Sequence, residues 1–293
     1  MTGTKLRDPE ALVSVDWLDA RLTDKSLRIF DCSTYLEFTP DEDAPYRVVS
    51  AADKFVDAHI PGSACLDLQR DFSAQGAAFS MTALPPDDMA AAFARAGVSD
   101  DSHVVLYSRN GPTWAARFWW MLRYVGFDRV SILDGGFPQW QATGKAVESG
   151  PSAYAPGHLT PAPRPGVFVG KDALLAAIDD PQTVTINALM PDVHSGQNPR
   201  YGRPGRIPGS VNIPAPHLFD TDTHLANEID RIAEAFDAVG AREAGQCITY
   251  CGGGIFATWD AFLLYQLGQD NIAVYDNSMS EWATTPELPM ETD

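Results

Sequence analysis

The chain has 293 residues, 39 acidic and 21 basic, which gives a formal net charge of −18 and an isoelectric point of about 4.5. This charge excludes nucleic acid and anionic membrane surfaces as the main partners, because both are bound by clustered Lys and Arg. At 45% hydrophobic and 10% aromatic residues the composition excludes disorder, and the length favours about two domains.

The sequence also indicates where the protein works. It contains no run of about 18 apolar residues and therefore predicts no membrane-spanning helix. Charged residues recur through the first twenty positions, which excludes the apolar core of a secretory signal. The four cysteines are unevenly spaced and do not form a disulfide framework. We therefore expect a soluble, reduced protein of the cytoplasm.

In the first half of the chain, short apolar runs predict strands at residues 27–30, 103–107 and 130–133. Between the last two, residues 115–125 have helical spacing and are followed by Gly126, a residue suited to a left-handed helix end. Fully apolar strands that alternate with helices are typical of a parallel sheet flanked by helices.

The second half repeats this pattern. Strands are predicted at residues 183–186, 248–250 and 272–275, and a helix over 258–267 ends at Gly268. In parallel sheets the chemistry lies at the carboxyl ends of strands, in the turn into the next helix. We therefore expect the functional site in such a turn.

Three motifs occur twice in the same order, roughly 145 residues apart. They are residues 59–63 and 206–210, residues 104–108 and 247–251, and residues 132–136 and 274–278. Three collinear matches predict two homologous α/β domains, at residues 9–149 and 167–288. Five prolines between Gly150 and Gly166 exclude a helix there and predict a semi-extended linker over 150–166.

The turn that follows the predicted strand at 248–250 carries a cysteine in a glycine-rich loop. We call it the Cys251 loop; its residues are Cys251, Gly252, Gly253, Gly254, Ile255, Phe256 and Ala257. Glycines reach positive φ at low cost, so several backbone N–H groups can point inward, and the next helix directs its positive end at the loop. Both effects stabilise the thiolate, the reactive form of cysteine. The alternative is a cysteine buried at the strand end as a small hydrophobe.

Two other classes of site fit part of this loop. Gly252, Gly254 and Ala257 satisfy a dinucleotide-binding fingerprint, with Asp276 at the next strand end. Too few residues follow for the rest of a nucleotide-binding half, however, and the matching turn at Ser108 lacks the pattern. A thiol phosphatase needs an arginine that closes the loop, where Ala257 stands. We therefore favour a thiol nucleophile of another class.

Taken in order, four motifs resemble the tandem-domain rhodanese family of thiosulfate and 3-mercaptopyruvate sulfurtransferases. They are residues 59–62, residues 206–209, the spacing Cys251-x-x-Gly254-x-x-Ala257 and residues 275–282. The resemblance implies two rhodanese-like domains, each a parallel sheet flanked by helices. It implies that Cys251 takes up sulfane sulfur as a persulfide and passes it to a thiol, such as thioredoxin or glutathione, or to cyanide. No metal or organic cofactor is implied.

The resemblance also assigns different roles to the two domains. Ser108 stands in the first domain where Cys251 stands in the second, and a hydroxyl does not hold a persulfide, so we expect the first domain to be catalytically silent. In such tandem enzymes the active loop faces the interface between the domains, which makes His59 and Arg109 candidates to reach it from the first domain. For His59 the alternative is a turn residue hydrogen-bonded to the backbone.

The sequence departs from both branches of the family. The thiosulfate enzymes carry Arg-Lys after the cysteine, and the mercaptopyruvate enzymes carry Gly-Ser, whose hydroxyl serves in proton transfer. Gly252 and Gly253 supply neither the cations nor the hydroxyl, and Phe256 makes the loop more apolar. The glycine directly after Cys251 favours 3-mercaptopyruvate as the small anionic donor. A degenerate loop also leaves open a non-catalytic sulfur-binding or regulatory module.

Arginines near position 200 are the candidates for capturing the anionic donor. Arg200 matches the second of two carboxylate-binding arginines that the resemblance implies, and Val193 stands in place of the first. Arg200 and Arg203 can bind a carboxylate or thiosulfonate through two hydrogen bonds each, and the alternative for each is a surface ion pair. Arg206 is interpreted as a surface residue, and Cys247 as a core residue.

Overall fold

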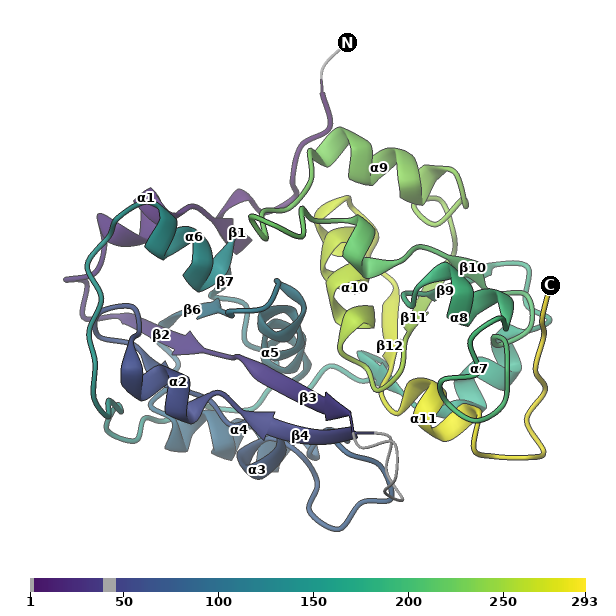
Figure 1. The fold of residues 1–293 in the computed structure, drawn as a ribbon, viewed down its shortest axis with the longest axis horizontal. Coiled ribbons are helices and arrows are strands. Elements are labelled where there is room, and N and C mark those ends of the chain that lie inside the picture. Colours follow the sequence, from purple (N-terminus) through teal and green to yellow (C-terminus); the bar gives the residue numbers. More distant parts are fainter. Residues whose placement is uncertain (1–2, 39–45) are drawn as a thin grey trace. The chain divides into compact units, whose positions relative to one another are not determined.

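The computed structural model describes residues 3–38 and 46–293 (Figure 1). The chain forms two compact units. One consists of residues 9–164 together with 221–225, and the other of residues 165–220 and 226–293 together with the N-terminal segment 3–8. Each half of the chain therefore contributes one short segment to the unit that the other half builds.

The first unit contains a parallel five-stranded sheet in the order β1-β7-β6-β2-β5. Its strands are β1 (Leu12–Val13), β2 (Leu27–Asp31), β5 (Ala64–Cys65), β6 (His103–Tyr107) and β7 (Val130–Leu133). A separate antiparallel pair is formed by β3 (Thr34–Phe38) and β4 (Tyr46–Ser50). The helices are η1 (Pro9–Ala11), α1 (Val15–Asp19), α2 (Ala52–Asp57), α3 (Leu68–Asp71), α4 (Pro86–Arg95), α5 (Thr113–Tyr124) and α6 (Gly136–Ala142).

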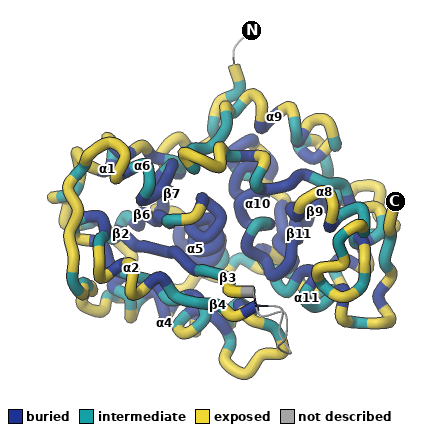
Figure 2. Tube along the Cα trace, viewed as in Figure 1, coloured by how far each residue is buried: buried dark blue, intermediate teal, exposed yellow. Residues whose placement is uncertain are grey.

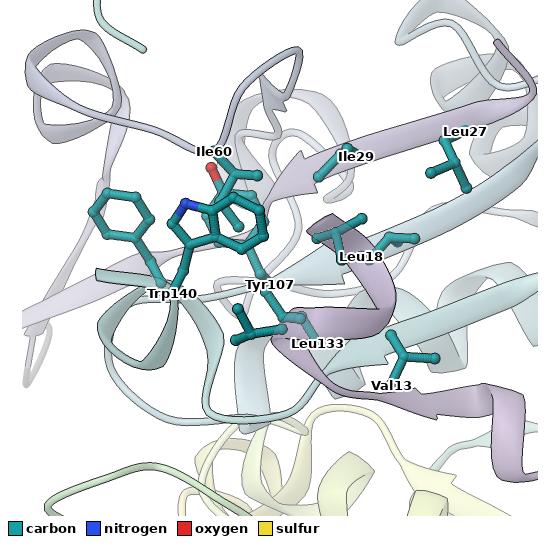
Figure 3. Close-up of a cluster of buried hydrophobic side chains, with 11 residues drawn as sticks. Val13, Leu18, Leu27, Ile29, Ile60, Tyr107, Leu133 and Trp140 are labelled. Atoms are coloured by element: carbon teal, nitrogen blue, oxygen red, sulfur yellow. The ribbon is translucent and has the colours of Figure 1, made fainter. Parts of the chain in front are cut away.

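One face of this sheet is covered by α1 and α6. Because side chains alternate along a strand, Val105 and Tyr107 of β6 point to the same face. They pack there with Leu18 of α1 and Trp140 of α6 (Figure 3). The complete cluster is Val13, Val15, Leu18, Leu27, Ile29, Ile60, Val105, Tyr107, Leu133, Phe137 and Trp140. This packing fixes the carboxyl end of β6 within the first unit.

The second unit contains a parallel five-stranded sheet in the order β10-β9-β11-β12-β8. Its strands are β8 (Phe168–Val169), β9 (Thr183–Asn187), β10 (Val211–Asn212), β11 (Gln246–Tyr250) and β12 (Ile272–Tyr275). Its helices are α7 (Lys171–Ala177), α8 (Pro191–Ser195), η2 (Ala215–His217), α9 (Ile229–Asp237), α10 (Phe256–Gln266) and α11 (Ser278–Trp282). The central strand β11 and the helix α10 are buried over most of their length (Figure 2).

The predicted α/β class and the parallel sheets are confirmed. The strands predicted at 103–107, 130–133 and 272–275 have the predicted bounds, and the other predicted elements differ by one or two residues at an end. Gly126 and Gly268 follow α5 and α10 with φ of 89° and 101°, which is the left-handed conformation predicted for both helix ends. No helix of the described ranges is both long enough and apolar enough to cross a membrane.

Residues 150–164 contain no helix or strand and lie along the first unit. The Tyr154 hydroxyl accepts a hydrogen bond from Ile29 N at 2.9 Å and donates one to the Gly62 carbonyl at 2.6 Å. Farther along, Arg164 forms an ion pair with Asp128. The proline-rich segment is therefore attached to the first unit as far as residue 164.

Candidate active site

Cys251 lies directly after β11, the middle strand of the second sheet, and five residues before the start of α10. It is 3% exposed. The Cys251 loop contains no charged side chain. Because α10 begins at Phe256, its N-terminus directs positive partial charge toward the loop, and within its first turn the Thr258 N–H is bonded to the Ile255 carbonyl at 3.1 Å. Within the loop, positive partial charge is therefore supplied by the backbone and not by a side chain.

Two carbonyl groups of the loop are held by the start of α11. The Cys251 carbonyl accepts from Met279 N at 3.0 Å, and the Gly252 carbonyl accepts from Ser280 N at 2.9 Å and from Ser280 Oγ at 2.7 Å. In a trans peptide the N–H points away from the carbonyl. Holding both carbonyls on α11 therefore turns the N–H groups of Gly252 and Gly253 to the opposite side of the loop, where they can face an anion.

The Ser278 side chain holds the backbone of Cys251 in place. Its Oγ accepts from Cys251 N at 3.1 Å and donates to the Tyr275 carbonyl at 2.7 Å. Ser278 has φ of 51°, in the left-handed region that non-glycine residues rarely adopt. Unusual backbone of this kind is concentrated at functional sites.

The other three cysteines are held as neutral thiols. Burial raises the pKa of Cys32 well above its usual value, and raises the pKa values of Cys65 and Cys247 to about 12 each. The Cys247 thiol also donates to the Ala241 carbonyl at 3.0 Å, so Cys247 is a core residue as predicted. Cys251 differs from these three by its place in a glycine-rich turn between the end of β11 and the start of α10, which makes it the cysteine best placed for covalent chemistry.

Arg203 has a structural role. Its guanidinium directs all five N–H groups at main-chain carbonyls around the end of α11, which belong to Trp282, Ala283, Thr285, Pro286 and Leu288, at distances of 2.7 to 3.5 Å. An arginine has only five such donors. No donor of Arg203 is left for a substrate carboxylate, which argues against the substrate-binding role predicted for it.

The remaining predicted residues lie as follows. Arg200 is exposed in the loop between α8 and β10. Arg206 pairs with Glu291 and Asp293. His59 is buried in the first unit, where its Nδ1 donates to the Phe55 carbonyl at 2.8 Å and its ring stacks on that of Phe55. This arrangement is the backbone-bonded alternative considered for His59.

No role was predicted from the sequence for Ser278, Ser280 or Tyr201. The two serines lie inside the family motif 275–282, and Ser278 also ends the repeated motif 274–278. Tyr201 lies against Gly252, and its only signal in the sequence was the glycine at position 252. Across residues 3–38 and 46–293, no group of three or more His, Cys, Asp or Glu is arranged to hold a metal ion.

A thiol nucleophile in an amide-lined turn after the central strand of a parallel sheet defines a covalent group-transfer site. A model of the rhodanese-like domain matches residues 14–143 and 171–285, so the chain belongs to the rhodanese family and contains two such domains. Together the family and the site make the protein a sulfurtransferase.

Individual relatives agree with this assignment. The chain is 32% identical to "Thiosulfate/3-mercaptopyruvate sulfurtransferase 1, mitochondrial" of Arabidopsis thaliana, over 97% of this chain and 78% of the relative. It is 29% identical to the 3-mercaptopyruvate sulfurtransferase of Escherichia coli, over 95% and 97% of the two chains. The crystal structure of the Escherichia coli 3-mercaptopyruvate sulfotransferase superposes with a TM-score of 0.77 at 26% identity and covers 92% of this chain and 98% of that one.

Proposed function

We propose that Cys251 takes sulfur from 3-mercaptopyruvate in preference to thiosulfate and passes it to a thiol or to cyanide. The observation that carries this preference is the buried and uncharged Cys251 loop. Thiosulfate is a dianion, and a buried loop that itself carries no cation would desolvate both charges beside the thiol with little compensation. In 3-mercaptopyruvate the negative carboxylate lies at the opposite end of the molecule from the sulfur, so the sulfur can enter the loop without bringing two negative charges with it.

The transfer would proceed in two steps. The Cys251 thiolate attacks the sulfur of the donor, the carbon–sulfur bond breaks, and its electron pair leaves on the enolate of pyruvate. The enolate then takes up a proton. An acceptor thiolate or cyanide next attacks the outer sulfur of the persulfide, and the electron pair of the sulfur–sulfur bond returns to Cys251. Two covalent steps replace one difficult transfer.

We assign Cys251 as nucleophile, the amide groups of residues 252–257 as the anion-binding part of the loop, and Arg200 as the residue that contacts the donor carboxylate. Arg200 is supported by its exposure and its position in the sequence. The first domain is assigned no catalytic step, because Ser108 replaces the nucleophile. Thioredoxin, glutathione and cyanide are the acceptors proposed.

The cytoplasm, a reducing compartment, is proposed as the site of action. All four cysteines, Cys32, Cys65, Cys247 and Cys251, are unpaired thiols in the structure. Disulfides persist in oxidising compartments, whereas a free nucleophilic thiol is maintained in reducing ones.

The proposal is tested by comparing turnover with the two donors under the same conditions. We expect kcat/KM for 3-mercaptopyruvate to exceed that for thiosulfate by at least about tenfold, equivalent to about 1.4 kcal/mol. The matched control is Cys251→Ser, which should lose turnover with both donors. Equal or faster turnover with thiosulfate would contradict the donor preference, and full activity of Cys251→Ser would contradict the nucleophile.

A further inference from the structure

The glycine at position 252 is required by its surroundings. Gly252 is not among the glycines with positive φ, unlike Gly254, whose φ is 73°. A Cβ atom at position 252 would overlap the hydroxyl oxygen of Tyr201 and would lie 2.5 Å from Tyr201 Cζ and 2.9 Å from Cε1. The end of the Tyr201 side chain therefore occupies the space beside the residue that follows the nucleophile.

The Cys251 loop and Arg203, a near neighbour of Tyr201 in the chain, are attached to opposite ends of the same short helix. The first residues of α11, Met279 and Ser280, hold the loop carbonyls. The end of α11 is bound by Arg203, two residues after Tyr201. The segment that carries Tyr201 and the Cys251 loop are therefore both held by α11 within one unit of the molecule, with the Tyr201 hydroxyl against Gly252.

A phenol at this place supplies what the loop sequence lacks. Position 253 is a glycine, so the loop itself carries no hydroxyl group. The tyrosine hydroxyl is both a donor and an acceptor, and it is neutral at physiological pH in its ordinary state. A neutral hydrogen-bond donor suits a loop that carries no charged side chain and beside which negative charge develops on a leaving group.

We propose that Tyr201 is a further catalytic residue, whose hydroxyl donates a hydrogen bond to the enolate oxygen of the departing pyruvate. This inference rests on the proposed donor. As the carbon–sulfur bond breaks, its electron pair moves into the enolate, and the Tyr201 O–H stabilises the oxygen on which the charge collects. Tyr201 keeps its proton, and the enolate carbon takes one from water. Gly252 is the partner residue that leaves room for the phenol.

The first test is Tyr201→Phe, which removes one oxygen atom and keeps the ring. Loss of a single donor to a developing oxyanion lowers kcat by about 10²–10³-fold. We expect a loss of about 10²-fold in the single-turnover rate of persulfide formation from 3-mercaptopyruvate, with KM little changed. Persulfide formation from thiosulfate, which releases no enolate, and discharge of the persulfide to a thiol should each change by less than about threefold.

The matched control is Tyr265→Phe on α10 in the same unit. Tyr265 is half-buried, and its ring stacks with the Arg7 guanidinium, a contact that phenylalanine retains. This variant should have wild-type rates with both donors. Equal losses with both donors in Tyr201→Phe would show a merely structural role and overturn the proposal, as would an unchanged rate with 3-mercaptopyruvate.

The contact itself is tested by a double-mutant cycle. Gly252→Ala places a methyl group on the phenol, and Tyr201→Ala removes the phenol. We expect the double variant to be more stable in thermal unfolding than the sum of the two single effects predicts. Additive effects would contradict the contact. Failure of the wild-type protein to form a persulfide from 3-mercaptopyruvate would instead overturn the proposed donor, so the two failures are distinguishable.

Discussion

After the central strand of the first domain the chain carries Ser108 and Arg109, and after that of the second domain it carries Cys251 and Gly252. Arg109 donates to the carboxylate of Asp31 at 2.7 Å and to the Ala58 carbonyl at 2.6 Å, and it lies 4.1 Å from the ring centroid of Phe137. Asp31 is fully buried. In the first domain the ion pair of Arg109 with Asp31 therefore fills the space beside the carboxyl end of β6.

The second domain keeps the backbone arrangement and loses both charges. Asn187 ends β9 at the position where Asp31 ends β2, each paired with the last residue of the central strand. Asn187 Oδ1 accepts from Leu189 N at 2.9 Å, as Asp31 Oδ1 accepts from Ser33 N at 3.0 Å. The turn after the strand is thus retained, while the uncharged residues Asn187 and Gly252 stand in place of the ion pair of Asp31 and Arg109.

A second difference concerns how the strand end is held. In the first domain Phe137 N, near the start of α6, donates to the Ser108 carbonyl at 3.0 Å. In the second domain Met279 N, near the start of α11, donates to the Cys251 carbonyl at 3.0 Å. In each domain the residue that precedes this donor has a positive φ: Gly136 in the first domain, at 56°, and Ser278 in the second, at 51°. A non-glycine residue there costs about 1–2 kcal/mol. The second domain tolerates this strain and gains the Ser278 Oγ that binds Cys251 N, which indicates that the position of Cys251 is functionally constrained.

The largest predicted effect concerns moving the thiol from one domain to the other. Pro112 precedes α5 where Ile255 precedes α10, so the first-domain turn has one backbone N–H fewer. Loss of one such donor lowers kcat by about 10²–10³-fold. We expect the double variant Ser108→Cys/Cys251→Ser to stay at least about 100-fold below wild type in pyruvate release. Recovery to within tenfold would show that the two turns are equivalent.

The next effect concerns the ion pair of the first domain. Asp31→Asn removes the buried carboxylate that pairs with the Arg109 guanidinium, and it should reduce the free energy of unfolding by about 3 kcal/mol. Adding Arg109→Gly recreates the neutral pair of the second domain and should restore at least half of that loss. Urea unfolding followed by tryptophan fluorescence measures both changes. Equal stabilities of wild type and Asp31→Asn would mean that the pair is not needed.

Arg203 and Arg200 form a matched pair of tests in the second domain. Arg203→Ala removes the hydrogen bonds around the end of α11, and we expect it to reduce the free energy of unfolding by about 2 kcal/mol. Arg200→Ala should reduce thermal stability less than Arg203→Ala does, and it should raise KM for 3-mercaptopyruvate about tenfold because it removes one contact to a carboxylate. The opposite pattern would mean that the two roles are exchanged.

The smallest predicted effect concerns Asp260 on α10, which corresponds in the repeat to Arg117 on α5. Within the described residues, neither carboxylate oxygen of Asp260 has a hydrogen-bond partner, and burial raises the pKa of this carboxyl group well above its usual value. A raised folded-state pKa means that stability is retained below the unfolded-state pKa, near 4, and falls as the pH rises above it.

Asp260→Asn removes this titration. We expect the variant to match wild type near pH 4 and to be more stable by about 1–2 kcal/mol at neutral pH. Thermal unfolding of both proteins across this pH range measures the difference. A stability difference that does not change with pH would contradict the buried neutral carboxyl group.

The central strands and the helices that follow them could be predicted from the sequence, because their apolar runs and terminal glycines are local signals. The edge strands β1, β5, β8 and β10 have two residues each and carry no periodicity of their own. Pairing with a neighbouring strand defines them, so no local pattern reveals them. The five-residue strands β3 and β4 and their antiparallel pairing were not predicted either.

The candidate site divides in the same way. The position of Cys251 follows from its place after a strand and before a helix. Tyr201 contacts Gly252, 51 residues farther along the chain, and Arg203 contacts the end of α11, about 80 residues farther along, so both contacts depend on how distant segments pack together. The sequence therefore indicated arginines suited to a carboxylate but could not show that Arg203 is already occupied by the backbone.

The most direct test of the account locates the transferred sulfur. The protein is incubated with 3-mercaptopyruvate in the absence of an acceptor, digested without reductant, and its peptides are weighed. The account predicts the added mass of one sulfur atom on the peptide that contains Cys251, and none on the peptides with Cys32, Cys65 or Cys247. Sulfur on one of those three residues, or on none of the four, would contradict the assignment of Cys251 as the sulfur carrier.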